Sequence, residues 1–579
     1  MKKFLPILLI LATALPAFAD VVPMSRAKAN AEQFLKQADP ARAPQLQLLF
    51  EEPKMTKAGP SDPEYFIFTD ARGGFVIAGG DDTVPAILGY STTSTIPAQG
   101  MPDNFKAWMD MWTRIVDAQR SAGAAPYEPR AAVRGNSPKV LETALWGQGD
   151  PYNLHCVVMN DDQHAITGCT ATATSIVMRY HQWPERGTGT LPGYKVTDKD
   201  GKSYTIDPVV LGERTYEWDK MPLTKANVDW TDEQKDAVAW LMSDVGIMLK
   251  SSYSPESTGA YAEDVATGLI KHFYYDASLL MAYKKFYDTE QWIALLENEI
   301  DQNRPVVYAG YSEGYESGHA FVLSGYDEND MLYINFGWNG NSNGYYAMPN
   351  FDDYVIGHRA VIGIKKEEGG IAPDNLTLWN LGVTSPAASF STGTAFKVSC
   401  KTISNDGTDD FTGDFAFAKY DRNDQLVEIV SAVKEYGIKR GYGLDLTDWD
   451  CVITTSIQAG DYIAPVYRSS RTPNWTPILY DHEGMTVGRL QVGDNVFLDE
   501  IVSLEYVSST GILTVSFSAT ATGELRRNGS PVSTGVTVKD DAIVIDANQL
   551  PLATYTLHLE RVTSRGTQTK DISLKIGLK

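Results

Sequence analysis

The spacing of hydrophobic and polar positions changes several times along the chain, and each change predicts a different kind of structure. Apolar residues at helical spacing predict helices over residues 25–37 and 101–123, and short apolar runs between them predict strands. Residues 20–135 are therefore expected to form a compact unit of helices and strands. The stretch that follows, AAPYEPRAAVRGNSPK, is rich in Ala, Pro, Gly and Arg, which is typical of an exposed linker that proteases can reach.

The pattern changes again after this linker. Residues 136–366 are dense in Tyr, Trp and Gly, with long loops and at least two helices, predicted around residues 169–182 and 233–248. Beyond them, short apolar runs alternate with turn residues, which predicts one β-sandwich over residues 372–492 and a smaller one over residues 497–579. The predicted fold class is therefore α+β, followed by all-β modules.

Residues 1–19, MKKFLPILLILATALPAFA, have the layout of a secretory signal peptide. Two lysines precede an apolar run, and Ala17, Phe18 and Ala19 form a small-residue exit, so cleavage is expected before Asp20. The mature protein is therefore expected to be secreted, at the cell surface or in the periplasm. No later apolar run is long enough to predict a membrane span.

The net charge of the mature chain narrows its possible partners, and its length sets the number of domains that it can form. Loss of the signal peptide leaves 48 basic against 73 acidic side chains, a net charge of about −25. Nucleic acid is therefore an unfavourable partner. The 579 residues, of which 43% are apolar, are enough for three or four domains. We expect a monomer.

The chain has four cysteines, which are too few and too scattered for a disulfide scaffold. Cys400 and Cys451 can pair with each other in the C-terminal half. Cys156 and Cys169 are each candidates for a free thiol, although a disulfide between them is also open.

Cys169 begins the predicted helix in the stretch TGCTATATSIVMRYHQWP. A helix N-terminus beside an imidazolium stabilises a thiolate, and Gly168 suits the turn that leads into such a helix. The small residues 170–175 allow the helix to lie close to its neighbours. A lone cysteine is nevertheless more often a small buried apolar residue, so the interpretation depends on its partners.

Two apolar runs, residues 319–326 and 331–338, are joined by the polar turn 327–330 and predict a hairpin. The hairpin brings Asn335 back toward His319, in a register that the sequence leaves open. An amide that holds one ring nitrogen of the histidine would leave the other to accept a proton from the cysteine. The alternatives are a strand-end histidine and a turn-capping asparagine.

Gln148 lies 21 positions before Cys169. Its side-chain amide and the backbone N–H of Cys169 can together bind the oxyanion of a tetrahedral intermediate, although the residue taken alone is an ordinary loop glutamine. His155, His164 and His181 lie near Cys169, but no HExxH or paired-cysteine spacing accompanies them. We therefore expect no metal site and no cofactor.

The order Gln148, Cys169, His319, Asn335 resembles that of papain-like cysteine peptidases. The resemblance implies a papain-like fold of two subdomains over residues 136–366, with Cys169 as nucleophile, His319 as base, Asn335 as orienting residue and Gln148 as oxyanion donor. Five local motifs narrow it to the streptopain family: WGQGDPYN, TGCTATATSIVMRYHQWP, TYEWDKMP, SGHAFVLSGYD and YINFGWNGNSNGYY.

The N-terminal unit shares in the resemblance, because GGFVIAGGDDTVPAILGYS followed by MPDNFKAWM is similar to the inhibitory prodomain of that family. The resemblance implies an endopeptidase made as a zymogen, with its own prodomain, residues 20–135, as intramolecular inhibitor and with proteins and peptides as substrates. Arg130 and Arg134 are candidate activation sites.

The resemblance also places Gly259, Gly318 and Trp338 along the substrate cleft. One departure is Phe336, where relatives look to have tryptophan after the orienting asparagine. Phenylalanine can still shield a hydrogen bond between His319 and Asn335 from water.

Phe336 and the long β region also leave a second hypothesis open. In it, the papain-like domain is an inactive scaffold, and the chain is a surface adhesin or binding protein that uses its β-sandwiches. The last module, residues 497–579, resembles small C-terminal β domains of secreted proteins. It can act as a sorting signal, as a spacer or as a substrate-docking module.

Overall fold

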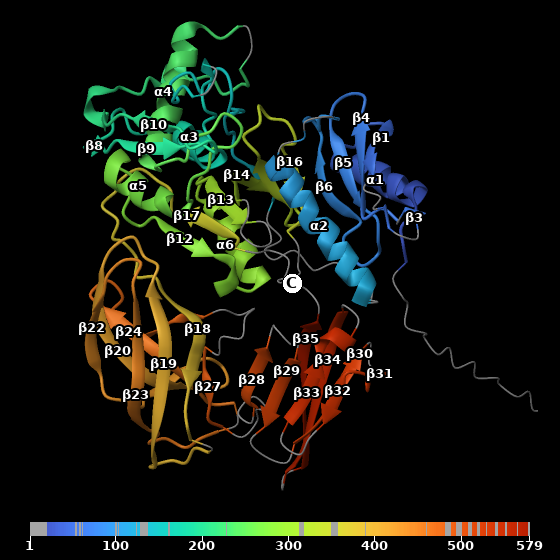
Figure 1. Cartoon of the computed structure of the whole chain (residues 1–579), viewed down its shortest axis with the longest axis vertical. Helices are drawn as coiled ribbons and strands as arrows, with labels where there is room; N and C mark the ends of the chain where they lie inside the picture. Colours follow the sequence, from blue (N-terminus) through green and yellow to red (C-terminus); the bar gives the residue numbers. More distant parts are fainter. Residues whose placement is uncertain are drawn as a thin grey trace, which may run out of the picture.

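A computed structural model of the whole chain shows a mixed region of helices and strands above two all-β modules (Figure 1). Residues 1–19, Arg130 and Arg134, to which the sequence assigns a signal peptide and activation sites, lie outside the described residues. The structure describes residues 20–51, 55–56, 59–60, 62–98, 101, 103–122, 124, 126–127, 137–159, 162–226, 229–311, 318–348, 357–387, 389–458, 460–480, 488–493, 501–507, 512–517, 521–527, 530–538, 542–550, 553–563 and 566–576.

One sheet runs through the whole mixed region. Its strand order is β1-β4-β5-β6-β16-β15-β14-β13-β17-β12, and β7 pairs with β14. All of these pairs are antiparallel. The strands are β1 (Leu46–Glu51), β4 (Tyr65–Asp70), β5 (Phe75–Gly79), β6 (Ile87–Ser91), β7 (Lys139–Val140), β12 (Leu280–Tyr283), β13 (Val306–Tyr311), β14 (Gly318–Tyr326), β15 (Leu332–Asn335), β16 (Gly344–Tyr346) and β17 (Arg359–Ile362).

The N-terminal unit and the region that carries Cys169 meet within this sheet. Tyr90 and Gly89 of β6 pair with Tyr345 and Tyr346 of β16. A Cβ atom at Gly89 would lie 2.7 Å from the ring of Tyr346, so the close approach of the two strands requires glycine there. The predicted N-terminal unit is thus an edge extension of the central sheet rather than a separate body.

Helices cover both faces of the sheet. Helices α1 (Met24–Ala38) and α3 (Cys169–His181) pack on one face, with α4 (Asp232–Met248) and α5 (Glu263–Phe273) beyond α3. Helices α2 (Asp103–Ala122) and α6 (Thr289–Asp301) cover the other face. The four helices predicted from periodicity begin and end within two residues of α1, α2, α3 and α4, which confirms them.

Short antiparallel strand pairs lie in the segment between α3 and α4 and in the loop after β1. They are β2 (Met55–Thr56) with β3 (Gly59–Pro60), β8 (Thr190–Leu191) with β11 (Val209–Val210), and β9 (Tyr194–Thr197) with β10 (Ser203–Ile206).

The first C-terminal module consists of two sheets around one apolar core. Cys400 and Cys451 lie buried in that core as free thiols, so the pairing that the sequence left open is not formed. Its strands are β18 (Leu376–Thr384), β19 (Ala395–Asn405), β20 (Phe411–Tyr420), β21 (Leu426–Ile429), β22 (Lys434–Ile438), β23 (Gly443–Val452), β24 (Tyr462–Ser469), β25 (Thr476–Pro477), β26 (Leu479–Tyr480) and β27 (Leu490–Gln491).

The second module consists of two four-stranded sheets, and its core around Leu525, Ile543 and Leu557 is smaller than that of the first module. The all-β character predicted for both modules is therefore confirmed. Its strands are β28 (Ile501–Val507), β29 (Ile512–Phe517), β30 (Ala521–Arg527), β31 (Ser530–Pro531), β32 (Val536–Val538), β33 (Ala542–Asp546), β34 (Ala553–Thr563) and β35 (Gly566–Ile576).

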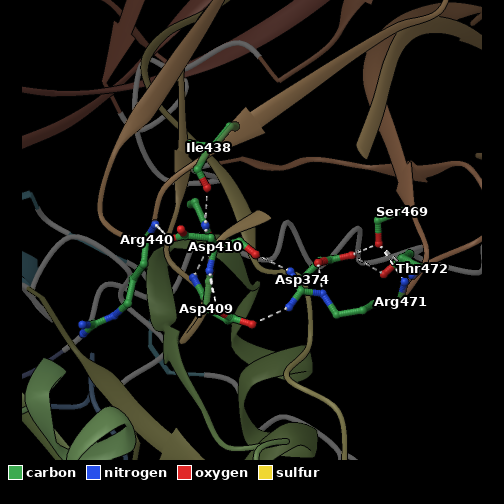
Figure 2. A network of polar contacts seen from close by, with 10 residues as sticks. Asp374, Asp409, Asp410, Ile438, Arg440, Ser469, Arg471 and Thr472 are labelled. Carbon is green, nitrogen blue, oxygen red and sulfur yellow. Dashed lines mark hydrogen bonds and ion pairs between the residues drawn. The ribbon is translucent and has the colours of Figure 1, made fainter. Parts of the chain in front are cut away.

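The chain that enters the first module is held by a polar network (Figure 2). The carboxylate of Asp374 accepts hydrogen bonds from Arg471 Nε at 2.9 Å and from the hydroxyls of Ser469 and Thr472. Arg471 also donates to the carbonyl oxygen of Asp410 at 2.8 Å. The start of the module is therefore fixed to its own strand-end loops by a buried carboxylate.

Candidate functional site

Cys169 is the first residue of α3, and the chain reaches it through an unusual turn. Gly168 has φ +85°, a conformation that residues with a side chain rarely adopt. A Cβ atom there would also lie 2.8 Å from the carbonyl oxygen of Thr258. The glycine before the predicted nucleophile is thus required both by the backbone conformation and by the available space.

Small buried residues let α3 lie directly against strands β13 and β14. Residues 170–175 are all buried, and the hydroxyl of Thr174 donates to the carbonyl oxygen of Thr170 at 2.8 Å, so the polar side chain is satisfied within the helix. Gly337, at φ +74°, would bring a Cβ atom within 3.1 Å of Thr172. This close packing holds the N-terminus of α3 at the end of β14.

The thiol of Cys169 is half-buried, and its surroundings disfavour the thiolate. Burial raises its pKa above the ordinary thiol value, and a hydrogen bond from the backbone N–H of Ala320 to Sγ, at 3.4 Å, opposes that rise only in part. A raised pKa means that the thiol, and not the thiolate, predominates at neutral pH. This conformation therefore holds the predicted nucleophile in its unreactive form.

His319 lies next to Ala320 on β14, and its register partner on β13 is Gly310. Successive residues of a strand point to opposite faces of the sheet. Ala320 packs on the α3 side, and Phe321 packs with the residues of α2 on the other side. His319 has the parity of Phe321, which explains why the hydrogen bond to the thiol comes from the Ala320 backbone and not from the imidazole.

One cavity of about 290 Å³ nevertheless joins the two predicted catalytic residues. Cys169 and His319 both line it, together with Gly259 and Gly318, which the sequence analysis placed along the substrate cleft. Trp338 is not among the lining residues, because its ring packs against the apolar cluster on the α2 side of the sheet.

Asn335 ends β15, fully buried, opposite Val322 of β14. The predicted hairpin is confirmed, and its register sets Asn335 three residues along the strand from His319. The side-chain Nδ2 donates to Thr143 Oγ1 at 3.0 Å and to the carbonyl oxygen of Ala144 at 2.9 Å. The hydrogen bonds of this amide within the described residues thus go to Thr143, Ala144 and Gly337, and none goes to His319.

Gln148 is buried in the loop that runs alongside the approach to Cys169. Its carbonyl oxygen accepts a hydrogen bond from the N–H of Thr167 at 3.1 Å, which ties the glutamine to a residue two positions before the cysteine. Its side-chain amide makes no hydrogen bond to any residue that the structure describes. The predicted oxyanion donor is thus tied to the approach to Cys169 through its backbone, and it is not among the residues that line the cavity of Cys169 and His319.

Helix α2 covers the back of this site. Its Asn104 donates from Nδ2 to the carbonyl oxygen of Phe336 at 2.8 Å. The ring of Phe105 meets that of Phe336 edge to face, with centroids 5.9 Å apart, and Trp108 meets Phe321 in the same way at 5.9 Å. Phe336 is 1% exposed, so in this state it is shielded by a helix of the N-terminal unit.

The other histidines near Cys169 have structural partners. His155 Nε2 lies 2.8 Å from a carboxylate oxygen of Asp236, and His164 Nδ1 lies 2.9 Å from the carbonyl oxygen of Cys156. The ring of His181 is partly buried against those of Tyr180 and Tyr275, and burial lowers its pKa to about 4. Among the residues that the structure describes, no group of three or more His, Cys, Asp or Glu side chains could hold a metal ion, and no helix could cross a membrane.

Comparison with known proteins shows the family to which the chain belongs. The peptidase C10 family matches residues 146–346, and the Spi protease inhibitor family matches residues 19–116. Streptopain of Streptococcus pyogenes is 30% identical over 332 residues, which are 53% of this chain and 81% of streptopain. The chain belongs to the peptidase C10 family. The streptopain-like resemblance, the α+β papain-like fold and the N-terminal prodomain are thereby confirmed.

Two further relatives show how much of this chain is similar to known proteins. The thiol protease/hemagglutinin PrtT of Porphyromonas gingivalis is 29% identical over 411 residues, which cover 66% of this C10 chain but only 46% of PrtT. This chain therefore spans less than half the length of that relative. A prointerpain A fragment of Prevotella intermedia is 28% identical, with a TM-score of 0.45, and the match covers 55% of this chain and 99% of the fragment.

Sequence reasoning missed several residues that shape the site. Ala320 contributes only its backbone N–H, so no side-chain signal could have singled it out. Asn104 lies in the first turn of the predicted helix 101–123, and nothing in the helical pattern shows that its amide reaches the peptidase domain. Thr143 carries a hydroxyl that the motif WGQGDPYN, which begins three residues later, does not include.

Proposed function

We propose that this C10 chain is a cysteine endopeptidase that is exported and made as a zymogen. The single observation that carries the proposal is the meeting of Cys169, at the N-terminus of α3, and His319 in one cavity of a peptidase-family chain. The Spi-like match of the N-terminal unit supports intramolecular inhibition by the prodomain. The protonated thiol and the helix α2 behind the site fit a precursor state.

The proposed reaction is acyl transfer to water. After activation, His319 accepts the proton of Cys169, and the thiolate sulfur attacks the carbonyl carbon of a peptide bond. Gln148 and the Cys169 N–H bind the oxyanion, and His319 returns the proton to the leaving amine as the C–N bond breaks. Water then hydrolyses the thioester with His319 as base, and Asn335 orients the imidazole throughout.

The division of the chain is part of the proposal. It comprises a signal peptide (1–19), an inhibitory prodomain (20–135), the catalytic domain (136–366), a β-sandwich (372–492) and a small C-terminal β-sandwich (497–579). Proteins and peptides are the proposed substrates, with Gly259 and Gly318 in the cleft and Trp338 beside it. Activation would follow cleavage near Arg130 or Arg134.

Paired cysteine variants test the proposal. Cys169→Ala removes the nucleophile and should abolish hydrolysis of a casein substrate after the linker has been cut by an added protease that is then inhibited. Cys156→Ala is the matched control, because Cys156 is buried in the same domain and burial raises its pKa to about 12. Equal activity of the Cys169→Ala variant and the control would disprove the proposal.

A further inference from the structure

The amide of Asn335 is locked in one orientation by three hydrogen bonds. Its two N–H groups donate to Thr143 Oγ1 and to the carbonyl oxygen of Ala144, and its Oδ1 accepts from the N–H of Gly337 at 3.1 Å. A flipped amide would set its oxygen against the oxygen of Ala144 and its N–H against the N–H of Gly337. The flip is therefore unfavourable, and the carbonyl end of the amide is defined.

Among the residues that the structure describes, these three hydrogen bonds leave one hydrogen-bonding position of Asn335 unused. An amide oxygen has two lone pairs, and Gly337 takes one of them. The second is open to an imidazole N–H, which is the bond that an orienting asparagine must make. The two N–H groups of Asn335 do not take part in that bond, because they donate to Thr143 and Ala144.

The hydroxyl of Thr143 is itself held in place by its backbone. Leu141 N–H donates to the carbonyl oxygen of Ser324 at 2.7 Å, and Leu145 N–H donates to that of Leu223 at 2.7 Å, so the chain on either side of Thr143 is fixed. Thr143 is 8% exposed, so bulk water competes little for its hydrogen bond. A rigid and buried acceptor is what a precise orientation requires.

We propose that Thr143 is a positioning residue of the peptidase: its hydroxyl orients the Asn335 amide so that Oδ1 faces the imidazole of His319 in the activated enzyme. The inference rests on the proposed function. Thr143 touches neither substrate nor the reacting atoms, and its effect passes through Asn335. Asn335 already has its amide fixed in this structure, whereas His319 has the parity of the opposite face of the sheet, so activation has to bring the His319 ring to the face on which Asn335 lies.

Three variants of Thr143 in the full-length protein test the proposal. Thr143→Val keeps the size of the side chain and removes the hydroxyl, whereas Thr143→Ser keeps the hydroxyl and is the matched control. Thr143→Ala is the second hydroxyl-free variant should the valine variant fail to fold. Thr143 also lines a cavity of about 290 Å³, so valine is preferred, because it leaves less room for a water molecule to replace the hydroxyl.

After linker cleavage, kcat and KM are measured with one peptide substrate across a range of pH. We expect Thr143→Val to lower kcat about tenfold with KM changed less than about twofold, because the loss falls on proton transfer and not on binding. An acceptor bonded to the imidazolium raises its pKa, so the alkaline limb of the kcat/KM profile should also move to lower pH in Thr143→Val. Thr143→Ser should behave as wild type.

Each possible result of these measurements either supports or overturns the positioning role of Thr143. Wild-type kinetics in Thr143→Val or Thr143→Ala, or an equal loss in Thr143→Ser without a shift of the alkaline limb, would overturn the positioning role while leaving the peptidase intact. An activated wild-type protein that hydrolyses nothing would overturn the proposed function, and the positioning role with it.

Discussion

The peptidase domain meets its neighbours at two junctions that are held in different ways. The N-terminal junction is built from paired strands and apolar rings: β6 pairs with β16, and Phe105 and Trp108 of α2 pack against rings of the catalytic sheet. The C-terminal junction combines one ring of the first β module, Trp379, packed on Phe286, with hydrogen bonds to the connecting chain. The buried carboxylate of Asp276 accepts hydrogen bonds from the N–H groups of Glu368 and Gly370, which belong to the connecting chain itself.

This difference between the junctions indicates which neighbour can dissociate from the peptidase domain once the chain is cut. At the N-terminal junction the contacts lie in the strands and in α2, so cutting the linker after α2 would leave the prodomain held only by non-covalent packing. At the C-terminal junction the connecting chain is part of the interface, and a Cβ atom at Gly370 would collide with Asp276. The first junction suits a removable inhibitor, and the second suits a permanent extension of the enzyme.

The largest expected effect is at the N-terminal junction. Trp108 is 5% exposed and contacts the rings of Phe321 and Tyr346, so Trp108→Ala should cost about 3–5 kcal/mol of interaction. That loss corresponds to a hold on the cleaved prodomain weakened at least about 100-fold. Gel filtration at high protein concentration after limited proteolysis of the linker measures it: the wild-type prodomain should co-elute with the peptidase domain there and dissociate only on dilution, whereas the variant prodomain should separate.

Asp110→Ala is the matched control for this experiment, because Asp110 is exposed on the same helix. Its prodomain should co-elute as in wild type. Co-elution of the Trp108→Ala prodomain would show that the ring packing does not hold the inhibitor, and the contrast between the junctions would fail.

At the C-terminal junction, Trp379→Ala should destabilise the protein without releasing the prodomain. The Trp379 ring packs edge to face on Phe286, with centroids 5.5 Å apart, and Lys285 Nζ lies 3.0 Å from its centroid. Because Trp379 is only half-buried, we expect a loss of about 2–3 kcal/mol, less than for a core tryptophan. Thermal unfolding measures the loss, with Tyr442→Ala, which alters an exposed side chain of the same module, as control.

A smaller effect should depend on pH at Asp276. Burial alone would raise the pKa of this carboxyl, but hydrogen bonds from Ser278, Glu368 and Gly370 outweigh burial and hold the pKa well below its usual range. Its contribution to stability is therefore present above the unfolded-state pKa near 4 and is lost as the pH falls through the lower folded-state value. Asp276→Asn should cost about 1.5–3 kcal/mol at pH 7.

Thermal unfolding between pH 7 and about pH 2 tests the sign. The gap between wild type and Asp276→Asn should narrow as the pH falls below about 4, because the carboxyl of the unfolded chain takes up a proton there while the folded carboxylate stays charged until the pH reaches its lower pKa. A gap that stays constant or widens on acidification would contradict the account of this junction.

The smallest expected effect is at the edge of the N-terminal junction. The Tyr90 hydroxyl donates to the Asp327 carboxylate at 3.0 Å, and burial together with Asp327 raises the pKa of Tyr90, so it stays a neutral donor. Tyr90→Phe should weaken the hold on the cleaved prodomain by about 1 kcal/mol, or about fivefold. Displacement of the cleaved prodomain from the enzyme during dilution measures the change, and a loss as large as that of Trp108→Ala would reverse the assigned order.

Periodicity and motifs were enough to predict much of this molecule. Helix α3 and the hairpin of β14 and β15 follow from local patterns, since apolar spacing reports burial directly. Separated motifs identified the peptidase family. The pairing of β6 with β16 could not be predicted, because it joins segments more than 250 residues apart and no local signal records strand partners.

The surroundings of the proposed catalytic residues, Cys169 and His319, were equally unpredictable from the sequence. The hydrogen bond from the Ala320 backbone N–H to the thiol depends on the register of β14. A shift of that register by one residue would exchange the faces on which the side chains of β14 lie. Asp276 looked like an ordinary loop aspartate, because its role comes from backbone N–H groups about 90 residues away. Sequence patterns report which residues are present, whereas these contacts depend on tertiary geometry.

The most direct test of the central claim is the intact mass of the purified protein after treatment with an epoxide inhibitor of cysteine peptidases under mild reductant. The measurement is made before and after limited proteolysis in the linker between residues 124 and 139. The account predicts one adduct, on Cys169, that forms only after cleavage. No adduct in either state would contradict it and favour an inactive scaffold that acts through its β-sandwiches, and full labelling before cleavage would contradict inhibition by the prodomain.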